Sequence, residues 1–351
     1  MKYLMDLSNT QNDRIQKLIQ EGKYQSIASF IYSAIENQLH LEESPPGIIT
    51  NEEQLKNTQL KSEFKWFIPP DIKMSVTNQL LSMDISDTLT VEPPANNRIT
   101  IQSAGKESEA NLWIWGQVNK IFPLKVGLRV LGNMLKQNKV SEIDLSLYRE
   151  AAAKTARDIG LKLLSLENSK KTKRGERVSS GLPIGEQAFS SESRYKTHFL
   201  ATIRKDGILD GALAKYKFVN IESRDKTYFI GVTKWGLEFA RLENPILDKQ
   251  DYTISLSDEE IDYCLKHIVT NVPGEQMAIK WMANAIKNGV NRPESINREL
   301  AKAYKEWTDS IVNTQRTGLI SRMFELELLE RTNDGVAVTY NLSARGKQIL
   351  S

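Results

Sequence analysis

Cysteine and histidine are almost absent from this chain, which has one cysteine and three histidines in 351 residues. Because Cys264 is the single cysteine, a disulfide within the chain is excluded. A chain without disulfides fits a reducing, intracellular compartment. The histidines, His40, His198 and His267, lie in unrelated segments without the spacing of metal ligands. We therefore expect no metal centre and no cofactor.

Long apolar runs and catalytic signatures are also missing. No stretch approaches the ~18 apolar residues of a membrane span, and the first residues lack the apolar core of a signal peptide. The chain has no glycine-rich phosphate-binding loop, no nucleophile elbow and no His-Glu-x-x-His motif. We expect a cytoplasmic or nucleoid-associated protein that is not an enzyme and has no membrane partner.

Positive charge is concentrated in one part of the chain. The net charge is only +3, yet residues 162–205 hold ten Lys or Arg against four Glu. The local excess is therefore twice that of the whole chain, and a basic patch attracts polyanions. We take its densest part as candidate DNA contacts: Lys170, Lys171, Lys173, Arg174 and Arg177. The alternative is a solvated loop that binds nothing.

The length of the chain allows two or three domains, and the pattern of apolar residues divides it further. The unit 1–44 ends at Pro45-Pro46-Gly47. Residues 45–110 look like a linker or a small α+β region with irregular connections. Two larger domains follow, and we place them at residues 111–250 and 251–351.

The last domain has the clearer pattern. Its apolar spacing predicts four helices followed by a hairpin, because Asn333-Asp334-Gly335 lies between two β-prone runs. The helices are expected at 257–270, 274–288, 293–306 and 309–328. The preceding domain predicts a similar order: helices at 118–135, 145–166, 191–204 and 208–215, strands at 216–221 and 228–232, and a helix at 234–242.

The ends of these two domains resemble each other. Val232-Thr-Lys-Trp-Gly and Leu342-Ser-Ala-Arg-Gly both run from a strand through Ser or Thr and a basic residue to glycine. The sequence therefore predicts two related units.

The N-terminal segment Lys2–Leu41 resembles the ribbon–helix–helix family of DNA-binding proteins and antitoxins. Tyr3, Met5 and Leu7 alternate as in a strand, a helix is expected at 9–20, and a second helix starts at Ser26 after Gly22. One short strand has no partner in its own unit. The resemblance therefore implies a homodimer whose two strands pair into an antiparallel ribbon.

In that family the ribbon enters the major groove, which admits a two-stranded ribbon. The groove-facing residues would be Lys2, Leu4 and Asp6, and the free N–H groups near Ser26 suit a phosphate. The sequence departs from the family because Leu4 and Asp6 stand where polar or basic residues are usual. Base reading by the ribbon and pure dimerisation both remain open.

The C-terminal segment from Gly318 to Arg331, with the hairpin and Leu342-Ser-Ala-Arg-Gly346, resembles winged-helix regulators. That resemblance places one set of side chains on the exposed face of a recognition helix: Asn313, Gln315, Arg316, Ser321 and Arg322. Contact with DNA and contact with a protein partner are both open for this unit. Trp113 and Trp115 are expected in the core, with base stacking as the alternative.

The sequence thus predicts a mainly α protein with small β elements, an α+β chain with an N-terminal ribbon–helix–helix unit and winged-helix-like domains. Its expected function is sequence-specific binding to double-stranded DNA as a dimeric transcriptional regulator. The alternatives are a plasmid or mobile-element replication or partition protein, and an antitoxin-like scaffold that binds a protein partner.

Overall fold

The computed structural model divides the chain into two units, residues 1–72 and 73–351. It describes residues 112–350 except 205–206, 225–226 and 334–337, together with five residues of the first unit. Those five are helical and lie in the two segments for which the sequence predicts helices: Asp13, Gln16, Ile19, Gln20 and Ile27.

The groove-facing residues proposed for the N-terminal ribbon, Lys2, Leu4 and Asp6, lie outside the described residues, as does Ser26. The ribbon and the dimer that it implies therefore stay predictions. The same holds for the region 45–110.

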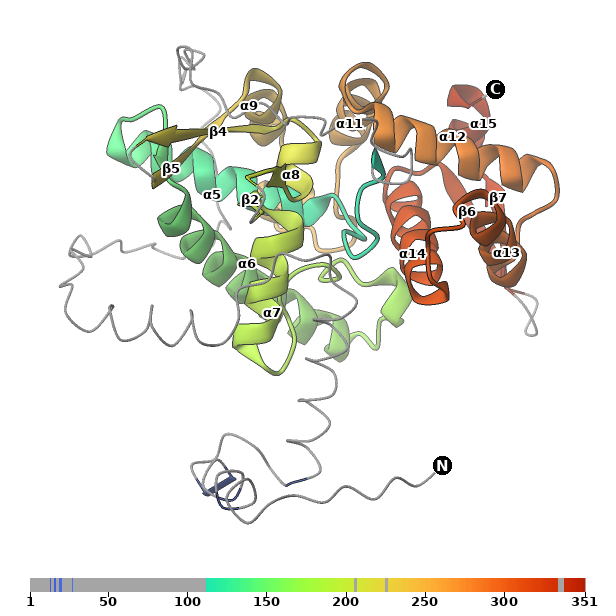
Figure 1. The fold of residues 1–351 in the computed structure, drawn as a ribbon, viewed down its shortest axis with the longest axis horizontal. Coiled ribbons are helices and arrows are strands. Elements are labelled where there is room, and N and C mark those ends of the chain that lie inside the picture. Colours follow the sequence, from blue (N-terminus) through green and yellow to red (C-terminus); the bar gives the residue numbers. More distant parts are fainter. Residues whose placement is uncertain are drawn as a thin grey trace. The chain divides into compact units, whose positions relative to one another are not determined.

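The described part of the second unit is mainly helical with small antiparallel sheets, which confirms the α+β class (Figure 1). Its first half contains α5 (Phe122–Asn138), β1 (Ile143–Asp144), α6 (Leu145–Ser169), η1 (Arg174–Glu176), α7 (Ala188–Arg194), η2 (Tyr195–Phe199), β2 (Thr202–Ile203), β3 (Leu209–Asp210), α8 (Ala212–Lys215), β4 (Val219–Arg224), β5 (Thr227–Val232), α9 (Lys234–Arg241) and α10 (Pro245–Lys249). Its second half contains α11 (Asp258–Asn271), α12 (Pro273–Lys287), α13 (Pro293–Ala303), α14 (Asp309–Glu325), β6 (Leu329–Asn333), β7 (Val338–Leu342) and α15 (Ala344–Ile349).

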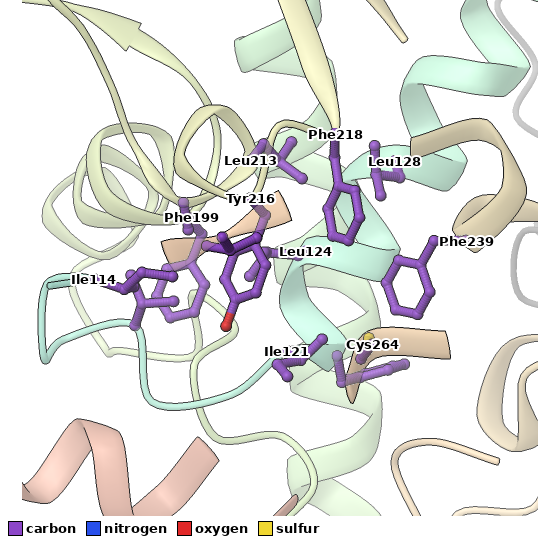
Figure 2. Packing of buried hydrophobic residues seen from close by; sticks show 14 of the residues in the cluster. Ile114, Ile121, Leu124, Leu128, Phe199, Leu213, Tyr216, Phe218, Phe239 and Cys264 are labelled. Atoms are coloured by element: carbon purple, nitrogen blue, oxygen red, sulfur yellow. The ribbon is translucent and has the colours of Figure 1, made fainter. Parts of the chain in front are cut away.

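Helix α5 lies at the centre of the core. Every residue from Phe122 to Gly132 is buried, which is the pattern of a helix covered on all sides. Pro123 stands in its first turn and Lys139 ends it in a left-handed conformation. Figure 2 shows aromatic side chains of the first half and Cys264 of α11 gathered around α5. The two halves therefore share one hydrophobic core.

The two halves repeat one arrangement of strands. In the first half, β1 precedes α6 and pairs with β5, which in turn pairs with β4. In the second half, Asn291 precedes α13 and its carbonyl accepts a hydrogen bond from the Tyr340 N–H of β7, which pairs with β6. In both halves the chain just before a helix is hydrogen-bonded to the second strand of a hairpin.

The corner after each hairpin is also repeated. The hydroxyl of Thr233 donates to the carbonyl of Lys217 and accepts from the N–H of Gly236, and Ser343 makes the same pair of bonds to Glu327 and Gly346. Lys217 and Glu327 both have left-handed backbones, with φ of 56° and 55°. The likeness predicted from the two chain segments is therefore confirmed in their local structure.

Glycine is required at this corner. A Cβ atom at Gly236 would lie 2.0 Å from the carbonyl oxygen of Phe218, and one at Gly346 would lie 2.1 Å from that of Leu328. In each half, the first turn of the helix that follows the hairpin therefore contacts the residue that precedes the first strand of that hairpin.

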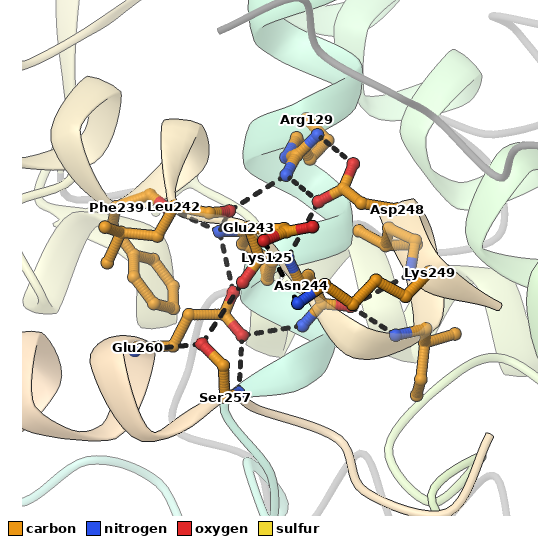
Figure 3. Close-up of polar contacts among 12 residues, drawn as sticks. Lys125, Arg129, Phe239, Leu242, Glu243, Asn244, Asp248, Lys249, Ser257 and Glu260 are labelled. Carbon is orange, nitrogen blue, oxygen red and sulfur yellow. Dashed lines mark hydrogen bonds and ion pairs between the residues drawn. The ribbon is translucent and has the colours of Figure 1, made fainter. Parts of the chain in front are cut away.

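A buried ion pair joins the two halves beside α5 (Figure 3). The Lys125 ammonium lies 2.7 Å from Glu260 of α11, and both side chains are fully buried. Lys125 also donates to the carbonyl oxygens of Phe239 and Leu242. Burial lowers the pKa of Lys125 to about 8, while burial raises the pKa of Glu260. Each charge therefore depends on the other to stay inside the core.

One helical turn further along α5, Arg129 makes a second buried contact. Its guanidinium forms a bidentate pair with Asp248 at 3.0 and 2.6 Å and donates to Leu242. Asn244 donates to Glu260 and to the carbonyl of Ser255. This polar cluster orients the connection between α9 and α11, and so it fixes the second half against the first.

Candidate nucleic-acid interface

Helices α13 and α14 are joined by a turn that aromatic rings hold in place. Tyr304 and Trp307 stack at 4.3 Å between ring centroids, and Trp113 packs edge-on against both, at 5.3 and 5.2 Å. Trp113 is only 2% exposed, so it belongs to the core and base stacking by it is excluded. Trp115 is half-buried. The start of α14 is therefore presented on a rigid support.

The face of α14 that points away from the core is polar. Ser310, Asn313 and Thr317 are exposed, and Arg316 and Ser321 are half-buried. Thr308 caps the helix by accepting from the Ile311 N–H. These side chains are hydrogen-bonding groups of the kind that read base edges in a groove.

Two side chains expected on that face are buried instead. Gln315 is 4% exposed and Arg322 is 1% exposed, so their predicted exposure is wrong. Arg322 forms a bidentate pair with Glu275 of α12, at 2.6 and 2.9 Å, and donates to the carbonyl of Val118. Neither side chain can reach DNA in this fold, and we assign both to the structure of the core.

The cause is a segment from the first half that crosses α14. A Cβ at Gly318 would lie 1.9 Å from the carbonyl oxygen of Gly116, and one at Gly116 would lie 2.2 Å from that of Thr314. The two backbones thus touch where both residues are glycine. This crossing covers the side of α14 that carries Gln315 and Arg322.

The basic segment after α6 reaches the surface. Lys170, Lys171 and Lys173 are exposed, and Arg177 is half-buried. The guanidinium of Arg177 donates to Asn168 at 3.0 Å and to the carbonyl of Thr172. The Arg174 side chain lies outside the described residues.

A buried carboxylate anchors this segment. Glu167, at the end of α6, accepts from the backbone N–H of Ser179 at 2.9 Å and from its hydroxyl at 2.5 Å. Both residues are almost completely buried. The exposed cations therefore stand on a loop whose two ends are tied together.

The structure brings the basic segment next to the hairpin that follows α14. A Cβ at Gly175 in η1 would lie 3.1 Å from the guanidinium of Arg331 in β6. Arg331 is exposed, as are the neighbouring acids Glu176 and Glu330. Arg331 is not among the DNA-contacting residues predicted from the sequence. Its place next to the expected turn at Asn333-Asp334-Gly335 was the available signal, because residues beside a turn lie at the surface.

Several cations of the basic segment, of α14 and of the β6–β7 hairpin form no ion pair within the described part of the chain. There, no carboxylate forms an ion pair with Lys171, Lys173, Arg177, Arg316 or Arg331. By contrast, Arg224 in the other hairpin contacts both Glu142 and Glu222. The surface thus keeps positive charge available for an anionic partner.

Among residues 112–350, with the gaps given above, no group of three His, Cys, Asp or Glu side chains could hold a metal ion. The described helices include none that combines the length and apolar character needed to cross a membrane. Cys264 is buried, and burial raises the pKa of its thiol. No known protein family, curated protein or solved structure matches the chain.

Proposed function

We propose that this protein binds double-stranded DNA in a sequence-specific manner and regulates transcription as a homodimer. In this proposal residues 273–350 act as a winged-helix unit. The order of α12, the residue Asn291 that bonds to β7, α13, α14 and the β6–β7 hairpin supports it. A recognition helix at the second position of a helix pair enters the major groove, and the polar face of α14 fits that role.

The observation that carries the proposal is the position of the basic segment beside Arg331. Phosphate contacts orient a protein on a duplex, and base contacts supply the specificity. Here Lys171, Lys173 and Arg331 would contact the backbone, while the start of α14 would face the bases. Both sets belong to one compact unit, because the buried pair Lys125–Glu260 and the bond from Arg322 to the Val118 carbonyl join the two halves.

Replacing Lys171, Lys173 and Arg331 together by alanine should weaken binding to all duplex sequences about equally. Each lost phosphate contact lowers the slope of log K against log salt by about 0.9, so the slope should fall by about 2.7. Fluorescence anisotropy with a labelled duplex at several salt concentrations measures both quantities.

A matched control removes three exposed lysines elsewhere: Lys154 on α6, Lys266 on α11 and Lys280 on α12. It makes the same change in net charge, and we expect it to leave the slope nearly unchanged. Equal slopes for the two triple variants would mean that the basic segment and Arg331 are not the contact surface.

The homodimer is proposed to form through the N-terminal unit. Deleting residues 1–44 should shift the protein toward a monomer, because the predicted ribbon strand would be lost and with it the pairing of two chains. Light scattering coupled to size-exclusion chromatography measures the mass directly. A truncated protein that stays fully dimeric would place the dimer interface elsewhere in the chain.

A further inference from the structure

The guanidinium of Arg316 is held in place by two neutral amides. Its Nε–H donates to the side-chain oxygen of Asn297 at 2.7 Å, and its Nη2 donates to that of Asn313 at 2.6 Å. Asn297 belongs to α13, whereas Asn313 precedes Arg316 by one turn of α14. The arginine is therefore fixed between the two helices, and its Nη1 end takes part in neither bond.

The charge of Arg316 is left uncancelled by this arrangement. Amide oxygens orient a guanidinium without neutralising it, and in the described part of the chain no carboxylate pairs with Arg316. Two other arginines of this half differ: Arg322 is paired with Glu275, and Arg345 with Asp258 and Asp262. An arginine that serves only to hold two helices together would gain more from a carboxylate.

We infer that Arg316 reads a guanine in the major groove, with Asn297 and Asn313 as its positioning residues; this inference rests on the proposed function. Arginine is the side chain whose planar fork matches O6 and N7 of guanine. Holding the fork in advance reduces the conformational entropy lost on binding. A phosphate requires only a positive charge, so the identity of the contacted group can be decided by experiment.

The experiment selects sites from a library of duplexes with a randomised core, using the full-length protein. Wild type should select a motif in which replacing one G·C pair weakens binding roughly 5- to 150-fold. Arg316→Ala should lose the preference at that pair and keep it elsewhere. Arg316→Lys keeps the charge but not the fork, so it should retain the salt slope and lose the same preference.

Two further variants separate positioning from charge. Asn297→Ala should weaken the preference at the same pair while the melting temperature stays close to that of wild type. Arg298→Ala is the matched control, because it removes an exposed arginine of α13 that takes no part in the bonds between Arg316 and the two asparagines. It should select the wild-type motif. Arg316→Lys remains informative if Arg316→Ala proves poorly folded.

The possible results are distinct. An unchanged motif for Arg316→Ala, with a salt slope lower by about 0.9, would show that Arg316 contacts a phosphate; DNA binding would stand and the inference would be wrong. A lost preference in Arg316→Ala together with full preference in Asn297→Ala would remove the positioning role. If the wild-type protein shows no salt-dependent binding to any duplex, both the proposed function and the inference are wrong.

Discussion

Replacing Lys125 by methionine should lower the free energy of unfolding by about 3–5 kcal/mol. Methionine fills most of the lysine volume, so the loss comes from charge and hydrogen bonding rather than from a cavity. Without the ammonium, Glu260 is left buried with no cation, and the carbonyl of Phe239 loses its donor. Chemical denaturation monitored by circular dichroism measures the change.

A second variant identifies the origin of that loss. Lys125→Met combined with Glu260→Gln should be more stable than Lys125→Met alone, because the glutamine is neutral and its oxygen can still accept from Ser257 and Asn244. Coupling between contacting residues is about 0.5–3 kcal/mol. The surface control Lys154→Met should change stability by less than about 0.5 kcal/mol. If the loss of stability in the double variant equals the sum of the losses in Lys125→Met and Glu260→Gln, the two residues are not coupled.

Helices with a regular apolar repeat could be predicted closely from the sequence. The expected helices at 257–270, 274–288 and 309–328 correspond to α11, α12 and α14 with small shifts at their ends. The hairpin expected around Asn333-Asp334-Gly335 is the β6–β7 pair, in register from Leu329 with Leu342 to Asn333 with Val338. These features depend on neighbouring residues, so the local pattern contains the information.

Residues 191–215 were predicted less well. The expected helices at 191–204 and 208–215 are replaced by α7, the π-helical turn η2, the strands β2 and β3, and the short α8. Strands of two residues, such as Thr202–Ile203, have no measurable alternation. Their pairing with Leu209–Asp210 is decided by tertiary contact.

The candidate site shows the same limit at the level of side chains. Asn313 and Gln315 were both expected on the exposed face of α14, but residues two apart lie on different sides of a helix, and Gln315 is buried. The helical repeat does not tell which side is covered. That depends on the segment around Gly116, which lies about two hundred residues earlier in the chain. The approach of Gly175 to Arg331 is likewise between distant residues. Gly318 in the middle of a helix was the one local sign of a close contact.

Gly318→Ala tests that contact, and two effects oppose each other in it. Alanine favours the helix over glycine by about 1 kcal/mol. Its Cβ would, however, lie 1.9 Å from the Gly116 oxygen and 2.6 Å from the Gly116 Cα, which are backbone atoms that no rotamer change can move away. Overpacking of this kind costs about 1–3 kcal/mol and sometimes more. We expect the clash to dominate, with a net loss of up to about 2 kcal/mol.

The control for helix propensity is Thr317→Ala, one residue earlier on the exposed side of α14. It should be neutral or slightly stabilising, since it meets no backbone from the first half. In Gly318→Ala, hydrogen exchange should accelerate along α14 and duplex binding should weaken, because the segment around Gly116 fixes the helix that carries Arg316. If Gly318→Ala proved as stable as wild type, helix propensity would outweigh the clash, and the backbone of Gly116 would not press on α14 in solution.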